Sequence, residues 1–147
     1  MEQRDKNTVK ADVERASSRI LELIDIKGTA TEPGATTMPC SDDYYQDEPY
    51  YALHPWSLYK APFAELQKGM NRLRVALPKD GWTITKDGRD GTIGNSPQIV
   101  AESKGRGFMV DVRLHKEVKA QKSPAMLEVT VQSRCYRSPV TPTPSEG

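Results

Sequence analysis

Two cysteines, Cys40 and Cys135, are the residues of this chain with the clearest chemistry. They lack the C-x-x-C spacing of a redox motif or a zinc site. In an oxidising compartment, two isolated cysteines are most simply joined as one disulfide. Such a bond would close a loop of about 95 residues and stabilise the fold by roughly 4 to 5 kcal/mol in the chain-entropy model. We therefore predict a Cys40–Cys135 disulfide in an extracytoplasmic protein; the alternative is two reduced thiols in a cytoplasmic one.

The two histidines, His54 and His115, are the other residues that could do chemistry. A Ser-His-Asp or Cys-His centre needs a histidine beside a nucleophile and an orienting acid, and the sequence has no G-x-S-x-G motif. The histidine spacing fits no metal site, and no phosphate-binding glycine motif occurs. We expect no catalytic residue, no metal ion and no cofactor, with His115 at the surface end of a strand.

An acidic and aromatic stretch occupies residues 42 to 59. Its acidic residues lack the D-x-D-x-D-G framework of a calcium loop, so a solvated acidic loop is expected. Tyrosine and tryptophan offer apolar area with a polar group, which suits recognition. The candidate residues for binding a ligand or partner are Tyr50, Tyr51, His54, Trp56 and Tyr59, with Asp42, Asp43, Asp47 and Glu48 at the rim. The alternative is that Trp56 and alternate tyrosines pack in the core.

The composition is that of a soluble globular protein. Of the 147 residues, 28% are charged and 36% hydrophobic, and the formal net charge is +1. This charge gives no basis for nucleic-acid binding, and no apolar run approaches the roughly 18 residues of a membrane span. We expect one α+β domain over residues 1–137 and a flexible Pro/Thr/Ser tail over 138–147.

Hydrophobic periodicity predicts two helices and about five strands. The helices are expected over 9–24, capped by Asn7 or Thr8, and from Pro62 to Leu77. Strands are expected over 50–59, 82–86, around 99–101, over 108–114 and over 127–135, with 28–40 extended or irregular and 87–95 a turn. Because Pro55 has no backbone donor, it requires a sheet edge or a bulge. Alternation places Ser133 and Cys135 on the inward face. Together these patterns predict a two-layer α+β fold, with an antiparallel sheet of four to five strands and two helices on one face.

Four segments resemble a family of small exported lipoproteins of actinobacteria. They are Tyr50–Tyr59 (YYALHPWSLY), Met70–Arg74 (MNRLR), Leu77–Trp82 (LPKDGW) and Leu127–Tyr136 (LEVTVQSRCY). The resemblance runs from about Ala11 to Tyr136. It implies export, a lipid-modified cysteine upstream of residue 1 and a domain held outside the cell membrane, but no activity. The polar start Met1–Lys6 then fits a mature form whose export signal has been removed.

The leading functional hypothesis is therefore a lipid-anchored extracytoplasmic module that binds a partner protein or a small ligand. Contact with the membrane would be made only through the N-terminal anchor, which this chain does not contain. Two alternatives stay open. One is a hydrolytic enzyme whose site is built from residues distant in sequence, and the other is a protein inhibitor or immunity protein.

Overall fold

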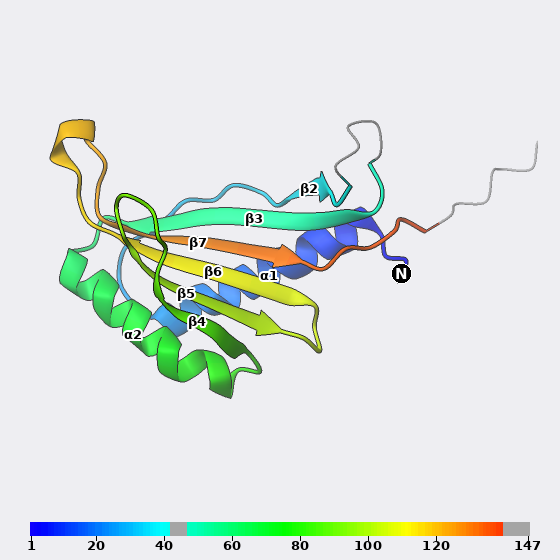
Figure 1. Ribbon diagram of the computed structural model, residues 1–147, viewed down its shortest axis with the longest axis horizontal. Coiled ribbons are helices and arrows are strands. Elements are labelled where there is room, and N and C mark those ends of the chain that lie inside the picture. The colour runs from blue at the N-terminus through cyan, green and yellow to red at the C-terminus, as the bar shows by residue number, and fades with distance from the viewer. Residues whose placement is uncertain (42–46, 140–147) are drawn as a thin grey trace, which may run out of the picture.

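The computed structural model describes residues 1–41 and 47–139 (Figure 1). The expectations for Asp42, Asp43 and the tail from 140 to 147 lie outside this range. In chain order the elements are α1 (Lys6–Ile24), β1 (Thr29–Ala30), β2 (Thr36–Pro39), β3 (Tyr50–Tyr59), α2 (Phe63–Lys79), β4 (Thr83–Arg89), β5 (Pro97–Ser103), β6 (Phe108–His115), the 3-10 helix η1 (Lys119–Gln121) and β7 (Met126–Ser133).

The fold is α+β, with an antiparallel sheet in the order β1-β3-β7-β6-β5-β4 and β2 also paired to β3. Over the described residues the sheet has seven strands, so the prediction of four to five was wrong in number. The two additional strands are β1 and β2, from the segment expected to be extended or irregular. Their burial does not alternate clearly, because they join the sheet through backbone hydrogen bonds to β3 rather than through an apolar face.

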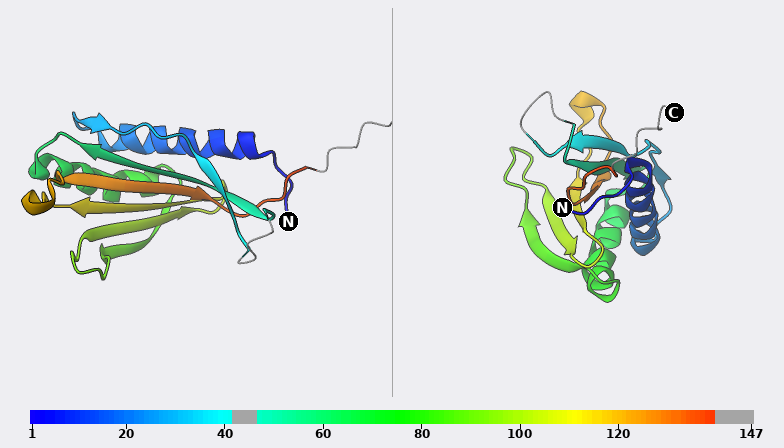
Figure 2. Two further views of the ribbon diagram at one scale, coloured as in Figure 1. Left: turned by 90° about the horizontal axis from the view of Figure 1, so that it is seen from above. Right: turned by 90° about the vertical axis from the view of Figure 1, so that its right-hand side faces the viewer.

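Both helices lie on one face of the sheet, as predicted (Figure 2). α1 packs on β3 and β7, and α2 packs on β4, β6 and β7. The helices meet closely at Gly69, where an added Cβ would come within 2.7 Å of the Ile24 Cγ2 atom. Between the layers lies one core of apolar side chains, whose largest fully buried members are Tyr50, Ile20, Ile24, Leu58, Leu66, Met70, Leu73, Leu77, Ile99, Leu114, Leu127 and Val9.

The helix ends differ from the predicted ones for local reasons. α1 begins at Lys6 because the Asp5 carboxylate accepts a hydrogen bond from the Thr8 backbone N–H, so the cap is neither Asn7 nor Thr8. α2 follows Pro62 as expected but continues to Lys79. Pro78 is tolerated in the last turn, where fewer helical hydrogen bonds remain to be lost.

Two strands also depart from their predicted bounds. β4 extends through Asp87 to Arg89, because these residues pair with β5 instead of forming the start of a turn. β7 ends at Ser133, which is buried as the alternation predicts. Cys135 lies beyond the strand and is only half-buried. The expectation that Cys135 continues the inward face was therefore wrong.

Pro55 lies at a local edge inside the sheet. On one side β3 pairs with β7 from Leu53 to Leu58. On the other side, β2 and β1 pair only with the two ends of β3, so residues 54–57 have no strand partner in the described part of the chain. The Ser57 carbonyl oxygen accepts from Thr31 N on this side, and Pro55, two residues earlier, has the same orientation. The missing N–H of Pro55 thus faces the gap, which confirms the predicted requirement for an edge.

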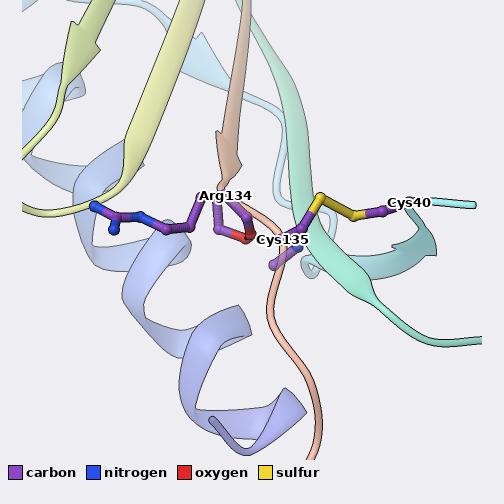
Figure 3. The surroundings of a disulfide bond; sticks show 5 residues. Cys40, Arg134 and Cys135 are labelled. Atoms are coloured by element: carbon purple, nitrogen blue, oxygen red, sulfur yellow. Dashed lines mark hydrogen bonds between the residues drawn. A yellow bond between two sulfur atoms is a disulfide. The ribbon is translucent and has the colours of Figure 1, made fainter. Parts of the chain in front are cut away.

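Cys40 and Cys135 form the predicted disulfide, with Cα atoms 6.4 Å apart (Figure 3). Cys40 directly follows β2, and Cys135 lies just after β7. Because Pro39 and Tyr136 pair with Tyr50 from opposite sides, the bond connects the two neighbours of β3 across its first residue. A disulfide is compatible with an extracytoplasmic location.

Candidate ligand-binding site

The structure divides the five candidate recognition residues between the two faces of β3. Tyr50 and Trp56 are buried on the helix-covered face, with 1% and 5% of their surface exposed, and His54 lies on that face between them. Tyr51 and Tyr59 are half-buried on the opposite face. Because side chains alternate along a strand, residues of even and odd number cannot form one patch. The aromatic stretch is therefore not a single recognition surface.

Tyr50 is part of the core rather than of a binding surface. Its phenol donates a hydrogen bond of 2.5 Å to the Arg4 carbonyl oxygen. Its backbone exchanges hydrogen bonds with Tyr136, at 2.9 Å and 2.7 Å. Burial, reinforced by the nearby negative charge of Glu48, raises the pKa of Tyr50 to about 12. Tyr50 thus joins the chain segments before α1 and after β7 to the start of β3.

The raised pKa of Tyr50 predicts a loss of stability at alkaline pH. An ordinary tyrosine has a pKa of about 10, so from about pH 10 to 12 the unfolded chain loses a proton that the folded chain retains. The free energy of unfolding must then fall as the pH rises through this window. We expect Tyr50→Phe to remove about 2 kcal/mol of this decline, measured by urea unfolding between pH 9 and 11.5. The Tyr59→Phe control should keep the decline; parallel pH profiles for wild type and Tyr50→Phe would contradict the prediction.

A cavity of about 330 Å³ lies between α1 and the interrupted edge of the sheet. It lies beside the segment between β1 and β2, which runs along the edge of β3 next to residues 54–57. Its lining comes from three parts of the chain, namely Glu14, Ser17, Ser18 and Leu21 of α1, residues 30–34, and His54 and Trp56 of β3. Two of the five candidate residues, His54 and Trp56, thus belong to one concave site.

His54 is held in this site by two hydrogen bonds. Its Nε2 is 2.8 Å from the Pro33 carbonyl oxygen, and its Nδ1 is 2.6 Å from Ser17 Oγ. Because the carbonyl oxygen only accepts, Nε2 carries the proton of the neutral ring and Nδ1 accepts from the Ser17 hydroxyl. Both nitrogens of the imidazole are thereby used, and its position is fixed.

Ser17 was not singled out from the sequence, although a signal was present. It falls between Val13 and Ile20 on the buried stripe of α1, so it is a polar residue at an inward position. An inward serine needs a hydrogen-bond partner, and His54 is the inward polar residue of the strand that α1 covers. Sequence periodicity could have placed each residue on its inward face, but not opposite each other.

The lining of the cavity has two features that bear on binding. Trp56 Nε1 is buried and has no hydrogen-bond partner among the described residues, which is unusual for a buried indole. The charged lining residues are Glu14 and Glu32, and neither Lys nor Arg is among them. One Glu14 oxygen accepts from Ala35 N at 3.1 Å, which fixes the carboxylate at the rim. The lining is therefore negatively charged, and the unpaired Trp56 nitrogen is not accessible from the cavity.

Comparison with known proteins gives no relative from which a role could be transferred: no family model, curated protein or solved structure matches the chain. Within residues 1–41 and 47–139, no three His, Cys, Asp or Glu side chains are grouped so that they could hold a metal ion. In the same part of the chain, no helix has the length and apolar character needed to cross a membrane. The role of the cavity is therefore argued from its own chemistry.

Proposed function

We propose that this protein is an extracytoplasmic binding module whose ligand is a small organic cation. The observation that carries the proposal is the lining of the edge cavity, which contains two carboxylates, no Lys or Arg, and the side chain of Trp56. Glu14 and Glu32 would attract the cation. The Trp56 side chain, which lines the cavity, would contact the cation with its aromatic surface.

The size and rigidity of the site support this role. A volume of about 330 Å³ lies at the lower end of the range for small-molecule sites. The wall is held in place because His54 connects α1 to residue 33 through hydrogen bonds. A preformed cavity binds without first ordering its wall, which favours affinity.

The setting of the module is the second part of the proposal. The disulfide supports an oxidising compartment. The resemblance to small exported lipoproteins supports a lipid anchor on a cysteine upstream of residue 1, with this domain outside the cell membrane. The ligand would then be taken from the extracytoplasmic medium.

Choline and its neutral isostere 3,3-dimethyl-1-butanol test the proposal, because they share a shape and a hydroxyl but differ in charge. We expect choline to change the tryptophan fluorescence and raise the melting temperature, and the neutral alcohol to do neither at the same concentration. The double variant Glu14→Gln, Glu32→Gln should bind choline about 10-fold more weakly, since losing about 1.4 kcal/mol of attraction has that effect.

Glu65→Gln serves as the matched control, because Glu65 is a partly exposed carboxylate on α2 that lies outside the cavity. This variant should bind choline as the wild type does. Equal binding of choline and the neutral alcohol would overturn the assignment of a cation, as would unchanged binding in the double glutamine variant. If the wild type responds to neither compound, the proposal of a choline-like ligand is overturned.

A further inference from the structure

A second and larger cavity, of about 810 Å³, lies at the end of the sheet where the β4–β5 and β6–β7 connections come close to the start of α2 (Figure 1). Its volume is within the range of small-molecule sites. It shares no lining residue with the edge cavity. The residues of this second cavity can therefore be tested separately from the proposed choline-type site.

A serine, a histidine and a carboxylate line this second cavity, with the serine at hydrogen-bond distance from the histidine and the carboxylate within 4 Å of it. Ser96 Oγ is 2.9 Å from His115 Nδ1, and His115 Nε2 is 3.7 Å from Glu128 Oε1. Ser96 immediately precedes β5, His115 ends β6, and Glu128 lies in β7. Three neighbouring connections and strands thus bring together residues that are distant in sequence, which is the arrangement of a nucleophile, a base and an orienting acid.

The Glu128 carboxylate favours one tautomer of the neutral His115 ring. A negative charge near Nε2 favours the tautomer with its proton on that nitrogen. Nδ1 is then the acceptor, and the Ser96 hydroxyl donates to it. This polarity is the one that lets a histidine remove a serine proton during attack. The roles of the two ring nitrogens are exchanged relative to chymotrypsin-like triads, but the proton path from serine to imidazole is the same.

The turn before Ser96 is held rigidly by one carboxylate. Asp90 Oδ1 accepts from the backbone N–H and hydroxyl of Thr92, at 3.1 Å and 2.8 Å, and from Ser96 N at 3.1 Å. Burial alone would raise the pKa of the Asp90 carboxyl, but these hydrogen bonds together hold that pKa below its ordinary value. The serine is therefore positioned before a substrate binds, which lowers the cost of reaching the attacking geometry.

Positive charge and apolar area complete the cavity. Arg89 and Lys116 line it, and the Arg89 guanidinium donates to the Asn95 carbonyl oxygen at 3.2 Å, beside Ser96. A cation at this position would stabilise the negative charge that develops on a carbonyl oxygen during attack. Leu114 and Met126 form part of the remaining wall, which suits the carbon chain of a small substrate.

We propose that Ser96, His115 and Glu128 form a hydrolytic centre for esters of small carboxylic acids. Ser96 Oγ attacks the carbonyl carbon and its proton passes to His115 Nδ1; the bond to the alcohol oxygen then breaks, and that oxygen takes the proton from Nδ1. Water attacks the resulting acyl-serine in the same way, giving its proton to Nδ1, and Ser96 leaves with that proton. The net reaction converts one ester and one water into a carboxylic acid and an alcohol.

The test uses p-nitrophenyl acetate as substrate and a fluorophosphonate as a covalent probe of the serine. We expect multiple turnovers by the wild type, and a loss of about 100-fold or more in Ser96→Ala and His115→Asn, the range that removal of a general base gives. Peptide mass analysis of the labelled wild type should find the phosphonyl group on Ser96, with fluoride released. This second readout needs no variant and holds even if Ser96→Ala folds poorly.

Ser103→Ala is the matched control, because Ser103 is a buried serine at the other end of β5 whose hydroxyl accepts from Arg106 instead of facing a histidine. It should keep the wild-type rate and the label on Ser96. A wild-type rate that persists in folded Ser96→Ala would overturn the proposal. So would a label on another residue, or no turnover and no label in the wild type. Choline binding at the edge cavity would be unaffected by either result.

Discussion

Removal of the Cys40–Cys135 bond is expected to lower the free energy of unfolding by about 2 to 5 kcal/mol. The bond spans 95 residues of sequence, so its loss frees most of the chain in the unfolded state. It also removes the covalent link between the two segments that pair with Tyr50, which end at Pro39 and Tyr136. A domain of this size has a net free energy of unfolding of about 5 to 15 kcal/mol. The disulfide is therefore expected to supply a large part of the stability of this protein.

Urea unfolding with and without dithiothreitol measures this effect. If the stabilisation arises from restricting the unfolded chain, reduction should also increase the dependence of the free energy on urea, because a freer chain exposes more surface. The double variant Cys40→Ser, Cys135→Ser should match the reduced wild type and should not respond to reductant. Identical unfolding midpoints for the oxidised and reduced wild type would contradict the prediction.

Tyr50→Ala is expected to be among the most damaging single substitutions, at about 3 to 5 kcal/mol, the cost of truncating a large buried aromatic side chain. The ring is 1% exposed, lies 6.4 Å from the Tyr136 ring between centroids, and carries a hydroxyl bonded to the Arg4 carbonyl. Truncation would leave a cavity and remove the partner of that carbonyl. Thermal and urea unfolding both report the loss.

Tyr59→Ala is the comparison that separates core from surface. Tyr59 ends the same strand but lies half-buried on the face away from the helices, so its truncation should cost no more than about 1 kcal/mol. Equal losses for the two variants would show that Tyr50 is not the core residue described here. The expected contrast would assign Tyr50 to the core, the alternative that the sequence left open for the tyrosines of this strand.

The helices and the longer strands could be predicted because their patterns are local. Val9, Val13 and Ile20 repeat at helical spacing and are all fully buried on α1. Leu127 and Val129 alternate with polar residues and are fully buried on β7. Each pattern depends only on residues a few positions apart, and a single amphipathic element must bury its apolar face wherever it is placed.

The candidate sites were only partly visible in the sequence. His54 and Trp56 were named as recognition residues, and both line the edge cavity. Tyr51 and Tyr59 lie on the other face because strand alternation separates them. Ser17 and Ser96 were not named, since a serine has no distinctive pattern until its histidine is known to lie beside it.

The sequence by itself determined the two helices and the longer strands with their buried faces, because periodicity is local, and it limited any intramolecular disulfide to Cys40 and Cys135, the only two cysteines. Tertiary structure alone decided that β1 and β2 flank β3 with a gap between them, and that each histidine meets a serine 37 or 19 residues away. Such contacts depend on how strands and helices are ordered in the sheet and its covering layer. That order is set by the sum of many weak packing interactions, and no single segment encodes it.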